Sequence, residues 1–97
     1  MNIKMPTKPT LAKYGLSEHE FRLIWLRQGS VCPICSKVPS TGRTNIDHFH
    51  IKGWKKLPPE QRKLYVRGVL CWFCNKQYLS RGITLEKARN MVKYLDT

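Results

Sequence analysis

Acidic residues are scarce in this chain of 97 residues. Six Asp and Glu stand against eighteen Lys and Arg, which gives a formal net charge of +12 at pH 7. Such an excess attracts polyanions, and nucleic acid is the natural partner. A ribosome-type structural protein would carry the same charge, so charge alone does not identify an enzyme. The basic residues are spread along the chain instead of gathering on one amphipathic helix, which argues against an anionic membrane surface as partner.

Long apolar segments are also missing. No apolar run approaches the roughly 18 to 20 residues that cross a bilayer. The N-terminus, "MNIKMPTKPTLAKYG", has neither an apolar h-region nor a small-residue cleavage site. Internal repeats and low-complexity tracts are absent from the sequence. We therefore expect a cytoplasmic protein without a membrane partner, folded as a single domain over residues 1–97 with a small core.

The N-terminal part is expected to form one helix. Residues 1–15 contain lysines, two prolines and little periodicity, which predicts a basic arm. Residues 16–30 predict a helix, because Ser17 and Glu20 have the spacing of a capping box, in which each side chain pairs with a free backbone N–H. One stripe of this helix would contain Phe21, Ile24, Trp25 and Gln28.

The remainder of the chain predicts an α+β fold. Residues 31–81 contain two short segments with strand character, "NIDHFH" and "YVRGVLC", and then "CNKQYLSRG", a helix that would end near Gly82. Residues 83–97 predict a C-terminal amphipathic helix. Its apolar face would consist of Leu85, Ala88, Met91, Val92 and Leu95.

No cysteine lies outside two C-x-x-C pairs. Cys32 and Cys35 form "CPIC", and Cys71 and Cys74 form "CWFC". Two such turns place four thiolates around one zinc ion, whereas two disulfides fit poorly with a chain that lacks a signal peptide. The spacing therefore predicts a structural Zn²⁺ that cross-links a small core. A four-thiolate shell has no open position for a substrate, so hydrolytic chemistry at this zinc is excluded.

Polar side chains gather in "NIDHFH", residues 45–50. Alternation along a strand would place Asp47 and Phe49 on one side and His48 and His50 on the other, so that both imidazoles could reach one substrate. A solvated strand end carrying three polar residues fits the same letters. The residues alone leave these two interpretations open.

The ordered arrangement "CPIC … IDHFH … VRGVLCWFCN", over roughly residues 32 to 80, resembles the recombination endonuclease VII family of phage nucleases, which belongs to the His-Me finger or HNH group. The resemblance implies a zinc-stapled ββα-metal nuclease core with flanking N- and C-terminal helices. Its activity would be metal-dependent DNA endonuclease chemistry. The substrate would be double-stranded DNA or a branched molecule of the Holliday-junction type.

The resemblance also assigns roles to individual residues. It implies that Asp47 and Asn75 bind a catalytic Mg²⁺, with Mn²⁺ as an alternative, that His48 is the general base, and that His50 lies near the scissile phosphate. This chemistry is coherent, because a neutral imidazole accepts a proton from water near physiological pH and Mg²⁺ prefers oxygen ligands.

The segment between the two strand-like stretches carries the basic residues expected beside the substrate groove. Arg67, in the V-R-G run, is the strongest candidate for a phosphate contact. Trp54 is a candidate for base stacking, while Trp72, between two cysteines, is expected to shield the zinc site. The predicted DNA contacts are Arg67, Lys52, Lys55, Lys56, Arg62, Lys63 and Trp54.

Two questions remain open from the sequence. The terminal helices would allow two chains to form a homodimer, as in junction-resolving members of the family. A zinc-stapled nucleic-acid-binding module without catalysis explains the charge and the cysteines equally well, but it gives no reason for D-H-x-H together with C-x-x-C-N.

His19, on the first predicted helix without a partner motif, is expected to be a solvated or packing histidine.

Overall fold

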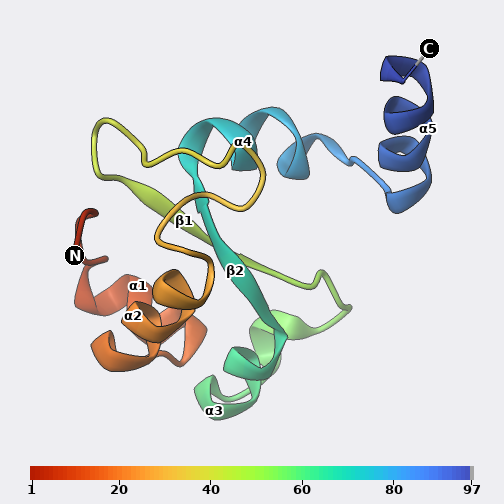
Figure 1. The fold of residues 1–97 in the computed structure, drawn as a ribbon. Helices are drawn as coiled ribbons and strands as arrows, with labels where there is room; N and C mark the ends of the chain where they lie inside the picture. The colour runs from red at the N-terminus through yellow and green to blue at the C-terminus, as the bar shows by residue number, and fades with distance from the viewer. Residues whose placement is uncertain (97) are drawn as a thin grey trace.

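The computed structural model describes residues 1–96 and has an α+β architecture (Figure 1). The described chain contains five α-helices and one two-stranded sheet, which confirms the predicted class. No helix in residues 1–96 is both long enough and apolar enough to cross a membrane. The helices are α1 (Lys8–Tyr14), α2 (Glu18–Arg27), α3 (Pro59–Arg62), α4 (Trp72–Gln77) and α5 (Leu85–Leu95); the strands are β1 (Thr44–His48) and β2 (Val66–Cys71).

The two strands form an antiparallel hairpin in which Thr44 pairs with Cys71 at one end and His48 with Val66 at the other. Both predicted strands are confirmed. The register shifts between Asp47 and His48, because β2 contributes one extra residue there. Such a bulge re-aims the side chains around it. Helix α4 follows β2 directly and packs against both strands.

The main core lies between the N-terminal helices and the hairpin. Residues 1–15, expected to be a loose arm, are instead part of this core: they contain helix α1 and two buried side chains, Ile3 and Leu11. The indole N–H of Trp25 donates to Oδ1 of Asn2 at 2.6 Å, which fixes the first residues of the chain. The buried core residues are Ile3, Leu11, Leu16, Phe21, Trp25, Ile46 and Val69.

Helix α1 is short and has no side-chain N-cap, so its position depends on tertiary contacts. Pro9 lies in its first turn, and Gly15 ends it in the left-handed conformation with φ of +69°. A Cβ on Gly15 would lie 1.9 Å from the carbonyl oxygen of Pro59, at the start of α3. Only glycine therefore permits both the turn and this close approach.

Helix α2 positions strand β2 through Gln28. The predicted capping box is present, because Ser17 Oγ accepts from the Glu20 N–H and Glu20 Oε1 accepts from the Ser17 N–H. Gln28 follows α2, and its amide pairs with Val69 as a neighbouring strand would: Oε1 accepts from the Val69 N–H at 2.7 Å, and Nε2 donates to the Val69 carbonyl at 2.9 Å. Gly68 leaves room for this contact, since a Cβ there would lie 2.9 Å from Gln28 Oε1.

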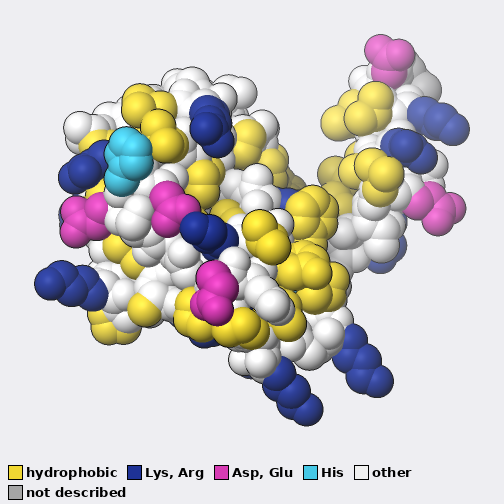
Figure 2. All heavy atoms as spheres, turned by 90° about the horizontal axis from the view of Figure 1, so that it is seen from below, with side chains coloured by type: hydrophobic (Ala, Val, Ile, Leu, Met, Phe, Trp, Pro, Cys, Tyr) yellow, Lys and Arg dark blue, Asp and Glu magenta, His cyan; other side chains and the backbone are white. Residues whose placement is uncertain are grey.

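Helix α5 stands apart from the rest of the molecule (Figure 1), and none of its residues is buried. Hydrophobic side chains cover the side of α5 that faces the body, while charged side chains lie on the opposite side (Figure 2). This apolar face agrees with the sequence prediction. Leu85, Ala88, Met91, Val92 and Leu95 all line a hollow shared with Ile34, Arg67, Tyr78, Leu79, Ile83 and Thr84.

The Gln28 contact predicts a specific loss of stability. Replacing Gln28 with Ala leaves the N–H and carbonyl of the buried Val69 without partners, so we expect the free energy of unfolding to fall by about 1–3 kcal/mol. The exposed Gln61 of α3 provides the same chemical change as a control. Urea unfolding should show a lower midpoint for Gln28→Ala than for Gln61→Ala, and equal midpoints would contradict the assigned role.

Candidate functional site

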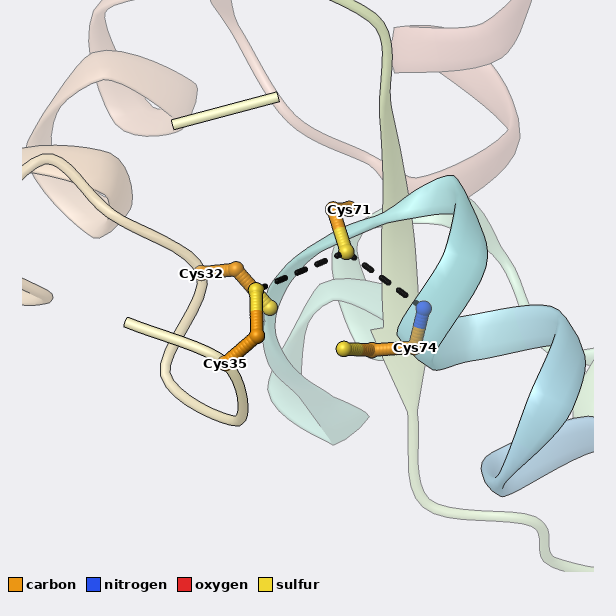
Figure 3. Close-up of side chains that lie close together, drawn as sticks. All are labelled: Cys32, Cys35, Cys71 and Cys74. Carbon is orange, nitrogen blue, oxygen red and sulfur yellow. Dashed lines mark hydrogen bonds between the residues drawn. The ribbon is translucent and has the colours of Figure 1, made fainter. Parts of the chain in front are cut away.

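Four cysteines from distant parts of the chain meet in one cluster (Figure 3). Cys32 and Cys35 lie on the loop after α2, Cys71 ends β2, and Cys74 lies in the first turn of α4. Their Sγ atoms all lie within 4.8 Å of one another, and the sulfurs of Cys35 and Cys71 are 3.9 Å apart. Sulfurs about 2.3 Å from a central zinc lie about 3.8 Å apart in a tetrahedron, so the cluster fits zinc.

Burial and backbone hydrogen bonds shift the pKa values of the clustered thiols in opposite directions. Burial opposes ionisation of Cys32, but backbone N–H groups of Cys35, Cys71 and Ile34 around its sulfur lower its pKa to about 7. Burial raises the pKa of Cys71 and of Cys74 above that of an ordinary thiol. A bound Zn²⁺ would lower the pKa values of all four thiols, because the charge of the metal deprotonates a coordinating thiol. The four cysteines therefore form a candidate structural zinc site.

Asp47 lies at the bulge of the hairpin and is nearly buried, with 6% of its surface exposed. Arg67, the extra residue of β2, donates to both carboxylate oxygens, from Nε at 2.6 Å and from Nη2 at 3.2 Å. The same guanidinium lies 5.0 Å from the ring centroid of Phe49. Asp47 and Phe49 thus share the Arg67 side of β1, as alternation predicts.

His48 and His50 lie together, with ring centroids 4.7 Å apart. His48 is half-buried and stacks on Trp54, at 3.9 Å between centroids and an interplanar angle of 18°. Tyr14 contacts both rings, at 5.8 Å from His48 and 5.5 Å from Trp54. Beside the histidines is a hollow of about 310 Å³, which we call the histidine hollow. It is lined by His48, His50, Ile51, Gly53, Trp54, Lys55 and Lys56.

The surroundings of His48 favour its neutral form. Burial lowers its pKa below the ordinary value of 6.5, and the nearby His50, Lys13 and Arg67 lower it further. Asp47 acts in the opposite direction but does not prevail. An imidazole that is neutral near pH 7 can accept a proton from water, which is the property required of a general base.

Asn75 follows Cys74 on α4 and is half-buried. Because Cys74 belongs to the cysteine cluster, the cluster fixes the position of the Asn75 backbone relative to the hairpin. No hydrogen bond joins Asn75 to Asp47 in the described residues. The structure therefore brings His48 and His50 together and places Asp47 beside Arg67, while a shared metal at Asp47 and Asn75 stays a prediction.

The expected DNA-contact residues separate into two groups. Lys52, Lys55 and Lys56 are exposed, and the last two line the histidine hollow. The other three cations are engaged within the chain: Lys63 pairs with Glu20 at 2.9 Å, Arg62 lies 5.7 Å from the Trp54 ring, and Arg67 holds Asp47. Arg67 pairs with Asp47 but keeps an exposed side chain, so its phosphate contact stays a prediction.

Burial corrects the expectation for Trp54. Trp54, a candidate base-stacking residue, is only 4% exposed because His48, Tyr14 and Arg62 surround its ring. Trp72 is 51% exposed and lines a hollow together with Cys35 and Cys71, so its expected shielding of the zinc site stays a prediction. The position of Tyr14 beside His48 was not predicted; the signal was the pair Pro9 and Gly15, which mark the start and end of a short helix.

Comparison with known proteins assigns the chain to a family. The family model described as recombination endonuclease VII matches residues 7–97, which is most of the chain. The chain belongs to the recombination endonuclease VII family. The resemblance seen in the cysteine pairs and in "IDHFH" is therefore confirmed, and the family match extends to α1, α2 and α5.

Two phage proteins are similar to this endonuclease VII family member. Over 70 residues it is 36% identical to the Gene 59 protein of Mycobacterium phage D29, and over 85 residues it is 33% identical to the Gene 59 protein of Mycobacterium phage L5. The matches cover 71% and 87% of this chain but only 36% and 42% of those proteins, so the chain spans less than half the length of these relatives. No solved structure matches it.

The cysteine cluster predicts a link between zinc and folding. Cys32 is fully buried, so Cys32→Ser should lose most of the bound zinc and the cooperative unfolding transition, because metal binding and folding are coupled in so small a core. Metal analysis and circular dichroism measure the two effects. Ser40→Ala, in the same loop, should retain about one zinc per chain. A folded Cys32→Ser protein with full zinc content would refute the assignment.

The environment of His48 predicts its titration in zinc-loaded protein without Mg²⁺. By NMR its imidazole should titrate with a pKa below 6.5, and His50→Ala should raise that pKa by removing a neighbouring positive charge. The pKa of His48 is lower in the folded than in the unfolded protein. The contribution of neutral His48 to folding stability is therefore present above pH 6.5 and is lost as pH falls through the folded pKa. Lys87→Ala on α5 is the control; a pKa unmoved by His50→Ala would contradict this account.

Proposed function

We propose that this chain is a metal-dependent DNA endonuclease in which β1, β2 and α4 form a His-Me finger site. The observation that carries the proposal is the histidine hollow. It brings together a half-buried histidine whose pKa is lowered, a second, exposed histidine and two exposed lysines, beside a buried carboxylate. These are the groups that phosphodiester hydrolysis needs, namely a proton acceptor and cations for the phosphate. Membership of the recombination endonuclease VII family supports the same reaction.

His48 acts as general base in this proposal, and Trp54 positions it. The stacked indole fixes the plane of the imidazole and excludes water from one of its faces, which keeps the ring neutral and aligned. His50, at the exposed edge of the hollow, is placed to contact the scissile phosphate. Lys55 and Lys56, two exposed residues that line the hollow, contact the flanking phosphates.

Asp47 and Asn75 would hold a Mg²⁺, with Mn²⁺ as an alternative. The donor set fits in chemistry, because a carboxylate and an amide carbonyl are hard oxygen ligands and Mg²⁺ keeps several of its waters. When bound, this ion supplies charge stabilisation to the phosphate and to the leaving oxygen. Arg67 already uses both oxygens of Asp47, so Arg67 must share the carboxylate or move toward the phosphate when the ion is present.

The Asp47–Arg67 pair also favours a second candidate function. If Arg67 held Asp47 permanently, the chain would be a zinc-stapled nucleic-acid-binding module without catalysis. Its net charge of +12 would suit that role. The two functions differ in one measurable property, which is cleavage of DNA in the presence of a divalent metal.

The proposed substrate is DNA, double-stranded or branched as in a Holliday junction. The relatives are phage proteins, so the proposed place of action is the cytoplasm of an infected host. A homodimer would form through α5, whose apolar face is exposed; Leu95 and Val92 are 77% and 67% exposed. The N-terminal helices contribute less to such a contact, since Phe21 and Trp25 of α2 are fully buried in their own chain.

The test is cleavage of supercoiled plasmid and of a synthetic four-way junction, each with Mg²⁺ and in buffer lacking it. His48→Ala should lower the cleavage rate by about 100- to 10,000-fold, the range for loss of a general base. Asn75→Ala should strongly lower the cleavage rate and raise the Mg²⁺ concentration needed for half-maximal cleavage. His19→Ala, at an exposed histidine of α2, should cleave as the original protein does.

Folding and binding controls separate chemistry from structure. His48→Ala and His48→Gln should keep their zinc and their affinity for DNA, which circular dichroism, metal analysis and gel shift would show. Metal-dependent cleavage that survives in His48→Ala would exclude His48 as base. Tight binding with no cleavage under Mg²⁺ or Mn²⁺ would establish the binding module instead.

A further inference from the structure

Two aromatic side chains are exposed beside the cysteine cluster. Trp72 and Phe73 open helix α4 between two buried cysteines, and yet they are 51% and 55% exposed. Trp25 and Trp54, the other two tryptophans, are 0% and 4% exposed. Burial of aromatic surface is a large favourable contribution, so adjacent exposed aromatic rings on a folded domain indicate a surface that a ligand covers.

The rings border a hollow of about 510 Å³, which we call the aromatic hollow. Val38 adds apolar surface to it, and Lys37 and Arg43 are its charged lining residues; no acidic residue lines it. The ammonium of Lys76 lies 4.6 Å from the centroid of the Trp72 ring. The hollow therefore combines flat apolar faces with positive charge, which is the chemistry that a base and its phosphates require.

We propose that the aromatic hollow binds an unpaired nucleobase of a DNA strand, stacked on Trp72, with Lys37, Arg43 and Lys76 contacting the flanking phosphates. The proposal rests on the proposed function and adds to it a preference for unpaired bases. An apolar segment of a protein partner would use the rings but would gain nothing from three cations without an acidic neighbour. A single-stranded nucleic acid uses both features.

The aromatic hollow and the histidine hollow lie at opposite ends of the hairpin. Arg43 precedes Thr44, which pairs with Cys71, whereas His48 pairs with Val66 at the far end. Four steps along a strand span about 13 Å, which is the length of about four nucleotides at 3.4 Å each. A base held at Trp72 would therefore lie a few nucleotides from the phosphate at His48. Branch points, flaps and bulges present unpaired bases at such distances from paired DNA.

Intrinsic fluorescence tests the contact without any mutation. In Mg²⁺-free buffer, an oligothymidylate of about eight nucleotides should quench the emission of Trp72 and protect it from acrylamide, since the other two tryptophans are buried. A blunt duplex of equal charge should do neither. Equal quenching by both DNAs, or none by the single strand, would overturn the proposal. Quenching that depends on protein concentration without DNA would show self-association at this surface instead.

Variants test the same contact through affinity and its salt dependence. Trp72→Ala should weaken binding of the single strand by about 5- to 150-fold, the effect of one lost base stack, without changing the slope of affinity against salt. Lys76→Ala should reduce that slope by about 0.7, because it removes one phosphate contact. Leu64→Ala, at an exposed apolar residue of the strand connection, should have no effect. Equal losses for single-stranded and duplex DNA in Trp72→Ala would overturn the proposal.

The outcomes distinguish this inference from the proposed function. Zinc content and circular dichroism of Trp72→Ala establish that the fold is intact, and Trp72→Leu serves as a second variant that keeps apolar bulk without a π face. If cleavage depends on His48 but single-stranded DNA does not change the fluorescence of Trp72, the inference is overturned and the proposed nuclease function stands. Binding through Trp72 without cleavage under any metal would support the inference and reject the nuclease.

Discussion

The meeting of four cysteines is the contact on which the second half of this fold depends. The cluster joins the loop after α2 to the end of β2 and the first turn of α4. Around it is a second small core whose buried members are Cys32, Leu70, Cys71 and Cys74. With only one buried side chain besides the cysteines in this cluster, apolar burial there is too small to hold α4 on the hairpin, and a zinc ion at the cysteines would supply the missing stabilisation. A chain of this size would otherwise leave the helix free to move.

That constraint has a consequence for the candidate site. Asn75 follows Cys74, and Asp47 and His48 lie on the strand that α4 contacts, so the cysteine cluster sets the position of a helix whose first turn faces the hairpin. At the other end, the bulge of β2 aims Arg67 at Asp47, and the connection between the strands buries Trp54 against His48. Two rigid supports, the cysteine cluster and an aromatic stack, thus lie on either side of the residues proposed for catalysis.

Local patterns predicted much of this fold. The capping box of Ser17 and Glu20, the two strands, the apolar face of α5 and the convergence of four cysteines follow from spacing, because each depends on neighbours in sequence or on ligand geometry. Helix α1 was missed because it has no side-chain cap and depends on Leu11 in the core and on Gly15 against Pro59. A short helix held by distant contacts leaves little periodic signal.

The contacts of charged and aromatic side chains could not be predicted from the sequence either. Nothing in the letters "VRG" or "RKLY" states that Arg67 will pair with Asp47, or Lys63 with Glu20. Likewise, neither the basic segment around Trp54 nor the cysteines on either side of Trp72 indicate that the first ring is buried and the second exposed. Such outcomes depend on which elements meet in three dimensions, and a single sequence carries no direct record of them.

The proposed nuclease site requires a divalent ion between Asp47 and Asn75 while zinc remains at the cysteines. Paramagnetic broadening by Mn²⁺ tests it most directly. In NMR spectra of the zinc-loaded protein, Mn²⁺ below one equivalent should broaden the signals of Asp47, His48 and Asn75 first, and excess Mg²⁺ should restore them. Broadening that begins at other residues, or no saturable broadening at all, would contradict a metal-dependent nuclease site on this hairpin.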